Sequence, residues 1–87
     1  MLRFAHWDGL TYYVNEESPT RHIILVQDEM GKKVLINLET GHIETDGQTH
    51  NTISFVNLAK AQKMIRNFRN DILDYWNEMK SASNGNF

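Results

Sequence analysis

Four histidines are the side chains of this sequence best suited to metal or acid–base chemistry: His6, His22, His42 and His50. A metal centre needs several converging ligands, and commonly two of them lie close together in the sequence. The sequence contains no His-x-His pair, no His-x-x-x-His pair and no cysteine. A metal or hydrolytic site would therefore require His22 to meet His42 or His50 from facing strands. We expect separate histidines on strands and loops instead, and no bound cofactor.

Nucleophilic catalysis has little support in the remaining residues. No Gly-x-Ser-x-Gly motif is present to expose a serine on a strand-to-helix turn. The paired carboxylates Glu16-Glu17 and Asp28-Glu29 lie in polar stretches, where solvated charge is ordinary. The glycines are isolated from one another and form no phosphate-binding loop. We therefore predict no catalytic residues, and an enzyme is the least favoured class.

The charge pattern in the C-terminal third points to binding. Four bases occur there without an acid among them, and three acids follow. A helix dipole favours acids near the N-terminus and bases near the C-terminus, so this order is unfavourable for an isolated helix. The bases could meet the phosphates of a nucleic acid or an acidic protein surface, although a solvated face is the simplest interpretation. The bases are Lys60, Lys63, Arg66 and Arg69, and the acids are Asp71, Asp74 and Glu78.

Aromatic side chains supply the second set of binding candidates. Alternation along the first two predicted strands places Phe4, His6 and Tyr13 on one face of a hairpin, opposite the face that packs on a core. Exposed aromatic residues often anchor protein partners. Few cations accompany these rings, which favours a protein over RNA. The complete set of protein-interaction candidates is Phe4, His6, Tyr13, Arg21, His22 and Tyr75.

The elements that must position these residues are strands followed by a helix. Strand-like runs cover residues 2–7, 10–14, 21–26, 33–38 and 42–45. Asp8-Gly9 between the first two runs predicts a type I′ turn, because both central residues of that turn need a positive φ. This turn sets Trp7 opposite Leu10, residue 5 opposite residue 12, and residue 3 opposite residue 14. The pattern predicts an α+β fold, in which an antiparallel meander of about five strands precedes one long helix packed on one face.

The helix is predicted from a change in period after residue 57. Apolar residues then recur at steps of three and four, which places them on one helical stripe. Ser54 or Asn57 is the predicted N-cap. The helix is either continuous or broken near Asn67 and Asn70, and residues 81–87 are predicted to form a flexible tail after a single domain of residues 1–80. The stripe comprises Leu58, Ala61, Ile65, Phe68, Ile72, Trp76 and Met79.

Length and composition limit the protein to one small domain. The chain has 87 residues, of which 40% are hydrophobic and 23% are charged, so it has the composition of a folded domain. Its net charge of −2 excludes a general polycation. No apolar run is long enough to cross a membrane, and no secretory segment is recognisable at the start of the sequence. We expect a cytoplasmic protein without a membrane partner.

Several segments resemble one bacterial protein family. They are Gly9-Leu10-Thr11-Tyr12-Tyr13-Val14, Ser18-Pro19-Thr20-Arg21-His22, Val34-Leu35-Ile36-Asn37-Leu38 with Gly41-His42-Ile43-Glu44, and Ile72-Leu73-Asp74-Tyr75-Trp76. Together they are similar to domain-of-unknown-function family 4160, which has a tyrosine-rich strand, a Pro-Pro-His-x-His motif and a helix closing with Leu-Leu-x-x-Trp. The resemblance covers most of residues 9–79. Of the Pro-Pro-His-x-His motif only Pro19 and His22 match.

The resemblance implies a small cytoplasmic α+β protein of the kind encoded beside a second small protein in toxin–antitoxin-like pairs. It brings no established activity. Taken with the residues themselves, it favours a protein-interaction module, either a toxin–antitoxin-like component or a homodimer. The alternatives are a nucleic-acid binder that uses the basic first half of the helix and, third, a histidine-dependent metal or hydrolytic site.

Overall fold

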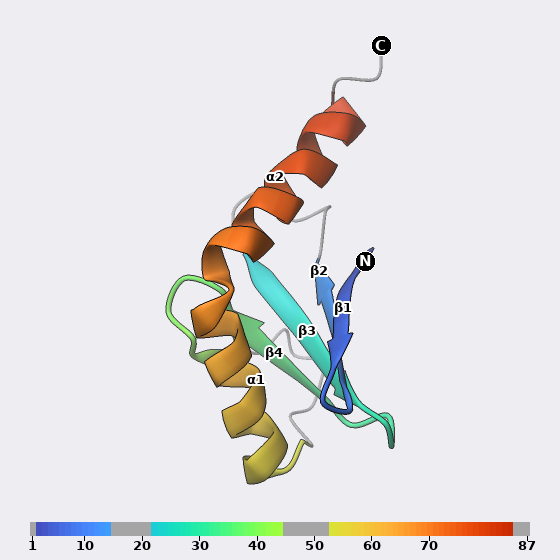
Figure 1. The fold of residues 1–87 in the computed structure, drawn as a ribbon, viewed down its shortest axis with the longest axis vertical. Coiled ribbons are helices and arrows are strands. Elements are labelled where there is room, and N and C mark those ends of the chain that lie inside the picture. The colour runs from blue at the N-terminus through green and yellow to red at the C-terminus, as the bar shows by residue number, and fades with distance from the viewer. Residues whose placement is uncertain (1, 15–21, 45–52, 85–87) are drawn as a thin grey trace.

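The computed structural model describes residues 2–14, 22–44 and 53–84, which form a sheet followed by two helices (Figure 1). The sheet has five antiparallel strands in the order β1-β2-β3-β4-β5. The α+β class and the meander predicted from the sequence are therefore confirmed. The strands are β1 (Leu2–Trp7), β2 (Leu10–Val14), β3 (Ile23–Asp28), β4 (Lys33–Asn37) and β5 (Ile43–Glu44), and the helices are α1 (Phe55–Asn67) and α2 (Arg69–Asn84).

The first hairpin turns at Asp8 and Gly9, as predicted. Their φ angles are 54° and 78°, the positive values that a type I′ turn requires. Trp7 pairs with Leu10, also as predicted.

The predicted register of the hairpin is wrong at its open end. Arg3 pairs with Tyr13 and not with Val14, because the register shifts between Arg3 and Ala5. The extra residue is Phe4, and such a bulge turns consecutive side chains toward the same side of the strand. Phe4 and Ala5 both pack against the hydrophobic core. Phe4 therefore does not share an uncovered face with His6 and Tyr13, as the simple alternation predicted.

Alternate residues of the three central strands form the core with the helices. Tyr12 pairs with Val26, and Val26 pairs with Val34, so one row of side chains crosses the sheet. These residues are fully buried and belong to one cluster with residues of both helices. Burial of this surface is the main favourable contribution to folding. The helix residues of the cluster are Ala61, Met64, Ile65 and Ile72.

The helical segment begins at a capped residue. Ser54 has an extended backbone, and its side chain accepts a hydrogen bond from the Asn57 amide at 3.2 Å. Of the two predicted N-caps, Ser54 is therefore the one used.

The helical segment is interrupted at Phe68, between the two predicted breakpoints Asn67 and Asn70. Phe68 has φ −112° and ψ 22°, although its amide still bonds to the Met64 carbonyl. The Ile72 amide in turn bonds to the Phe68 carbonyl, so helical hydrogen bonding continues through the interruption. α2 runs to Asn84, past the predicted helix end at residue 80, and its last turns project beyond the sheet (Figure 1).

Candidate interaction surface and the two flanks of the helices

An apolar groove lies between strand β1 and the interruption of the helices. Phe4, Ala5, Trp7, Met64 and Phe68 line a cavity of about 350 Å³ there. Trp7 is 56% exposed and Phe68 46% exposed, although Met64 between them is buried. We term this cavity the β1 groove. A partner side chain placed in it would cover two large rings that the fold leaves in water.

A second, smaller cavity extends the β1 groove toward the first turn of the sheet. Its volume is about 180 Å³, and its lining includes Asp8, Lys60, Lys63 and Asn67. The Lys60 ammonium lies 3.3 Å from the Asp8 carboxylate, and both side chains are about half exposed. Lys63 is exposed and has no ion pair with a described residue. Lys63 is therefore the cation beside this second cavity that remains available to a partner.

Strand β1 is itself part of this surface, because it lies at one edge of the sheet. Among the described residues, no strand pairs with its outer edge. The backbone amides and carbonyls of an edge strand can pair with another chain. The exposed residues along this strand are Leu2, Arg3, His6 and Trp7. Strand β1 therefore offers accessible backbone hydrogen-bonding groups next to an apolar groove.

Beneath the groove, Tyr12 is fully buried, and its hydroxyl has no hydrogen-bond partner among the described residues. Burial raises the pKa of Tyr12 to about 12, and the nearby carboxylate of Asp8 adds to the increase. Both effects disfavour the phenolate, so the neutral hydroxyl is retained over the physiological range.

The predicted protein-interaction residues do not form one cluster. Phe4 and Tyr75 contact each other edge to face with ring centroids 5.3 Å apart, and the Tyr75 hydroxyl donates to the Arg3 carbonyl at 3.3 Å. These two rings therefore connect β1 to α2. His6 is exposed and shares a 2.7 Å hydrogen bond with the Thr11 hydroxyl. Tyr13, on the outer sheet face, pairs with Arg3 and Leu25, and Arg21 lies outside the described residues.

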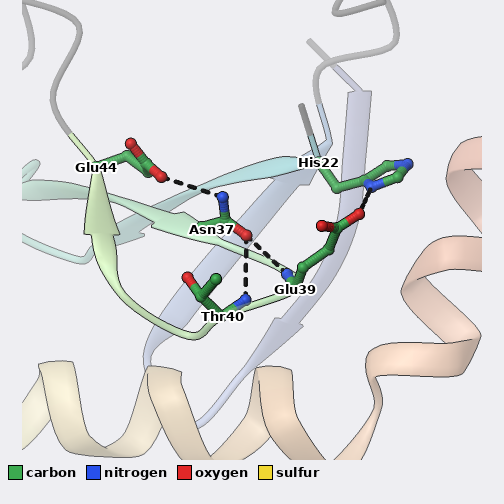
Figure 2. A network of polar contacts seen from close by, with 5 residues as sticks. All are labelled: His22, Asn37, Glu39, Thr40 and Glu44. Atoms are coloured by element: carbon green, nitrogen blue, oxygen red, sulfur yellow. Dashed lines mark hydrogen bonds and ion pairs between the residues drawn. The ribbon is translucent and has the colours of Figure 1, made fainter. Parts of the chain in front are cut away.

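His22 directly precedes the central strand β3 and lies beside the turn between β4 and β5. Its Nδ1 is 3.0 Å from a Glu39 carboxylate oxygen, and its ring lies edge to face against Trp76 with centroids 4.4 Å apart. Asn37 organises the same turn, because its side-chain oxygen accepts from the amides of Glu39 and Thr40 (Figure 2). This arrangement gives His22 a structural role in holding the turn and α2 together.

The structure places the four predicted nucleic-acid residues on two sides of the helices. We term the side next to the β1 groove the β1 flank and the side next to the β4–β5 turn the turn flank. Lys60 and Lys63 line the cavity beside Trp7, whereas Arg66 and Arg69 line a different cavity beside the β4–β5 turn. Each step of three residues turns by about 60° around a helix, so residues six apart, such as Lys60 and Arg66, lie on different sides. The four cations therefore line two cavities and not one.

The described residues hold no group of three or more His, Cys, Asp and Glu side chains that could bind a metal ion. Of the histidines weighed for a metal or hydrolytic site, His50 falls outside the part of the chain that the structure describes. Among the described helices, none has the length and apolarity required to span a membrane.

Sequence analysis did not identify the residues that line the β1 groove. The sequence pattern placed Trp7 on the hairpin face toward the core and Phe68 on the apolar stripe of the helix. In the structure both side chains line the β1 groove. The meander already implied that β1 is an edge strand. The missing information was how far the helices cover the side chains of that edge, and they leave Trp7 and Phe68 about half exposed. No family model, curated protein or solved structure matches this chain.

Proposed function

We propose that this protein is a protein-interaction module that self-associates through β1 and the β1 groove. The observation that carries the proposal is the exposed pair Trp7 and Phe68 beside an unpaired sheet edge. An exposed edge strand with apolar neighbours is a common site of strand addition. The occupant we propose is a second copy of the chain.

A twofold axis at the middle of β1 would pair this strand antiparallel with its copy. Such an interface is self-complementary, because the same residues contribute from both sides. At its start β1 contacts α2, through Arg3 and Tyr75, and its end lies beside α1, because Trp7 and Met64 line the same cavity. The twofold operation therefore brings α1 of one copy beside α2 of the other.

The charges of the helices fit this arrangement. Lys60 and Lys63 lie on the β1 flank of α1. Tyr75 marks the β1 flank of α2, and Asp71 and Glu78 are four residues before it and three after it, which places them on the same flank. In the proposed dimer the lysines of each copy would face the acids of the other. This pairing also offers a reason for the order of charges along the helices, which runs against the helix dipole.

The test is light scattering after size-exclusion chromatography, recorded over a wide range of protein concentration. We expect a dimer whose dissociation constant rises with salt, because exposed ion pairs are screened. Replacing Trp7 by Ser should weaken the dimer by roughly tenfold to a hundredfold, as is usual for an aromatic residue at the centre of an interface. Phe55→Ser is the matched control, because Phe55 is 89% exposed and lies outside the groove.

A charge exchange provides the sharper test. Lys63→Glu should weaken the dimer, and the pair Asp71→Lys with Glu78→Lys should weaken it as well. Combining the three substitutions should restore association, because the complementary signs are then exchanged between the flanks. A monomer at every concentration would overturn self-association, and the groove would then be tested against a second protein, such as the partner in a toxin–antitoxin-like pair. An excess of absorbance at 260 nm that high salt removes would favour nucleic acid instead.

A further inference from the structure

The flank of the helices opposite the β1 groove contains a larger cavity. Its volume is about 460 Å³, and it lies between the β4–β5 turn and the interruption of the helices. The turn contributes one wall, and residues of α1 and the start of α2 contribute the other. The lining residues are Leu38, Glu39, Thr40, Gly41, Gln62, Ile65, Arg66 and Arg69.

Hydrogen bonds hold the turn wall in place. The Asn37 side-chain oxygen accepts from the Glu39 amide at 2.8 Å and from the Thr40 amide at 3.1 Å, and the Gly41 amide donates to the Asn37 carbonyl at 2.7 Å. The Gln62 side-chain amide then donates to the Gly41 carbonyl at 3.1 Å, which connects the turn to α1. The cavity is therefore formed before any ligand binds, which lowers the entropy cost of binding.

The helix wall presents two guanidinium groups. Arg66 near the end of α1 and Arg69 at the start of α2 both line this cavity, so their side chains lie on the same side of the helices. Both are exposed, and neither has a hydrogen bond or an ion pair with a described residue. Lys60 on the other flank differs, because it is paired with Asp8. The acid among the described lining residues is Glu39, which is engaged with His22 on the turn wall.

The charge of these two groups indicates the class of ligand. A phosphomonoester carries about −1.5 to −2 charges at neutral pH, which matches two guanidinium groups, whereas a carboxylate carries one charge. Guanidinium groups also fit phosphate geometry, because they donate in parallel to two oxygens. The volume exceeds that of a phosphate group, and Leu38 and Ile65 supply an apolar surface for an organic body.

We propose that this cavity binds a phosphate group between Arg66 and Arg69, with the rest of a small phosphorylated molecule against Leu38 and Ile65. The site is independent of the proposed dimer, since it lies on the other flank of the helices. Glu39 sits on the wall facing the arginines and opposes the bound anion, so it limits affinity without preventing binding.

The experiment is a titration of the full chain, followed by backbone amide shifts in NMR spectra, with inorganic phosphate and with adenosine 5′-monophosphate as probes. We expect shifts at Gly41 and Gln62 and tighter binding of the monophosphate. Equal binding of both probes would assign the site to free phosphate. The double variant Arg66→Gln with Arg69→Gln should weaken binding by roughly tenfold or more, because two charge-assisted contacts are lost.

Two further variants make the test specific. Lys32→Gln removes a positive charge outside both cavities and should leave the affinity unchanged. Glu39→Gln removes the opposing charge and should strengthen binding severalfold. Binding that the double arginine variant retains, or that Lys32→Gln also weakens, would overturn the proposal, because the attraction would then be general. Since none of these exposed side chains is needed for the core, loss of folding does not confuse the result.

Discussion

The two flanks of the helices carry cations in different settings. On the β1 flank, Lys60 is paired with Asp8, acids follow the lysines along the same flank, and the neighbouring cavity is apolar. On the turn flank, Arg66 and Arg69 have no partner among the described residues, and the neighbouring cavity is walled by a hydrogen-bonded turn. Mixed charge beside exposed rings suits a protein surface, whereas concentrated charge in a preformed cavity suits a small anion. The comparison shows that a run of bases in one helix need not act as one site.

The largest expected effect comes from a residue that supports both flanks. Ile65 is buried in the core cluster and also lines the turn-flank cavity. Replacing Ile65 by Ala should lower the free energy of unfolding by about 2–5 kcal/mol, because it removes buried methyl groups and leaves a cavity. Chemical denaturation measures the loss. Both dimerisation and phosphate binding should weaken, and a variant that loses only one of them would show that the flanks are less connected than the core suggests.

The second prediction concerns Tyr12, which pairs with Ala5 of β1. Its pKa is about 12 in the folded protein and 10.0 for an ordinary tyrosine. Between these values the unfolded chain loses its proton while the folded chain keeps it, so stability falls as pH rises from 10 to 12. The loss should reach roughly 3 kcal/mol in full, from about 1.4 kcal/mol for each pH unit between the two values.

Tyr12→Phe provides the control for that pH dependence. The variant should lack the part of the alkaline destabilisation that Tyr12 causes. The destabilisation that remains in the variant then reports the other groups that titrate in this range, such as the lysines. At neutral pH it should be as stable as the parent protein or more so, because the hydroxyl is buried without a partner among the described residues. A variant that is destabilised at neutral pH would show that the hydroxyl has a favourable partner.

Much of the fold was predictable from local patterns. Strand-like runs identified β2 and β4, Asp8-Gly9 identified the turn, and Ser54 was one of two expected N-caps. Each of these depends on residues that are close in the sequence. The bulge at Phe4 was not predictable in this way, because its reason lies in a contact with Tyr75, far along the chain.

The candidate sites were less predictable than the fold. The sequence identified Lys60, Lys63, Arg66 and Arg69 as one set of cations, and only their places beside β1 and the β4–β5 turn divide them. The exposure of Trp7 likewise follows from the position of β1 at the sheet edge. Side-chain exposure and cavity walls arise from tertiary packing, which single-sequence periodicity does not contain.

The third prediction separates the flanks through Asn37. Its side chain accepts from two amides of the β4–β5 turn and donates to Glu44 at 3.0 Å. Asn37→Ala should cost about 1–3 kcal/mol of stability, because the turn amides lose their acceptors. Phosphate binding should weaken in the titration, while the dimer dissociation constant stays the same. A variant that changes the dimer but not phosphate binding would reverse the assignment of the two flanks.

The smallest effect is expected at the ion pair between Lys60 and Asp8. The two groups are 3.3 Å apart and about half exposed, so the pair should contribute only about 0.2–1 kcal/mol, and less at high salt. Lys60→Met keeps the length of the side chain and removes its charge, so denaturation should detect at most this small loss. Because Asp8 already partners Lys60, Lys60→Met should weaken the dimer less than Lys63→Met does. A larger effect from Lys60 would mean that this lysine leaves Asp8 on association, and the cation available to a second copy would then be Lys60 and not Lys63.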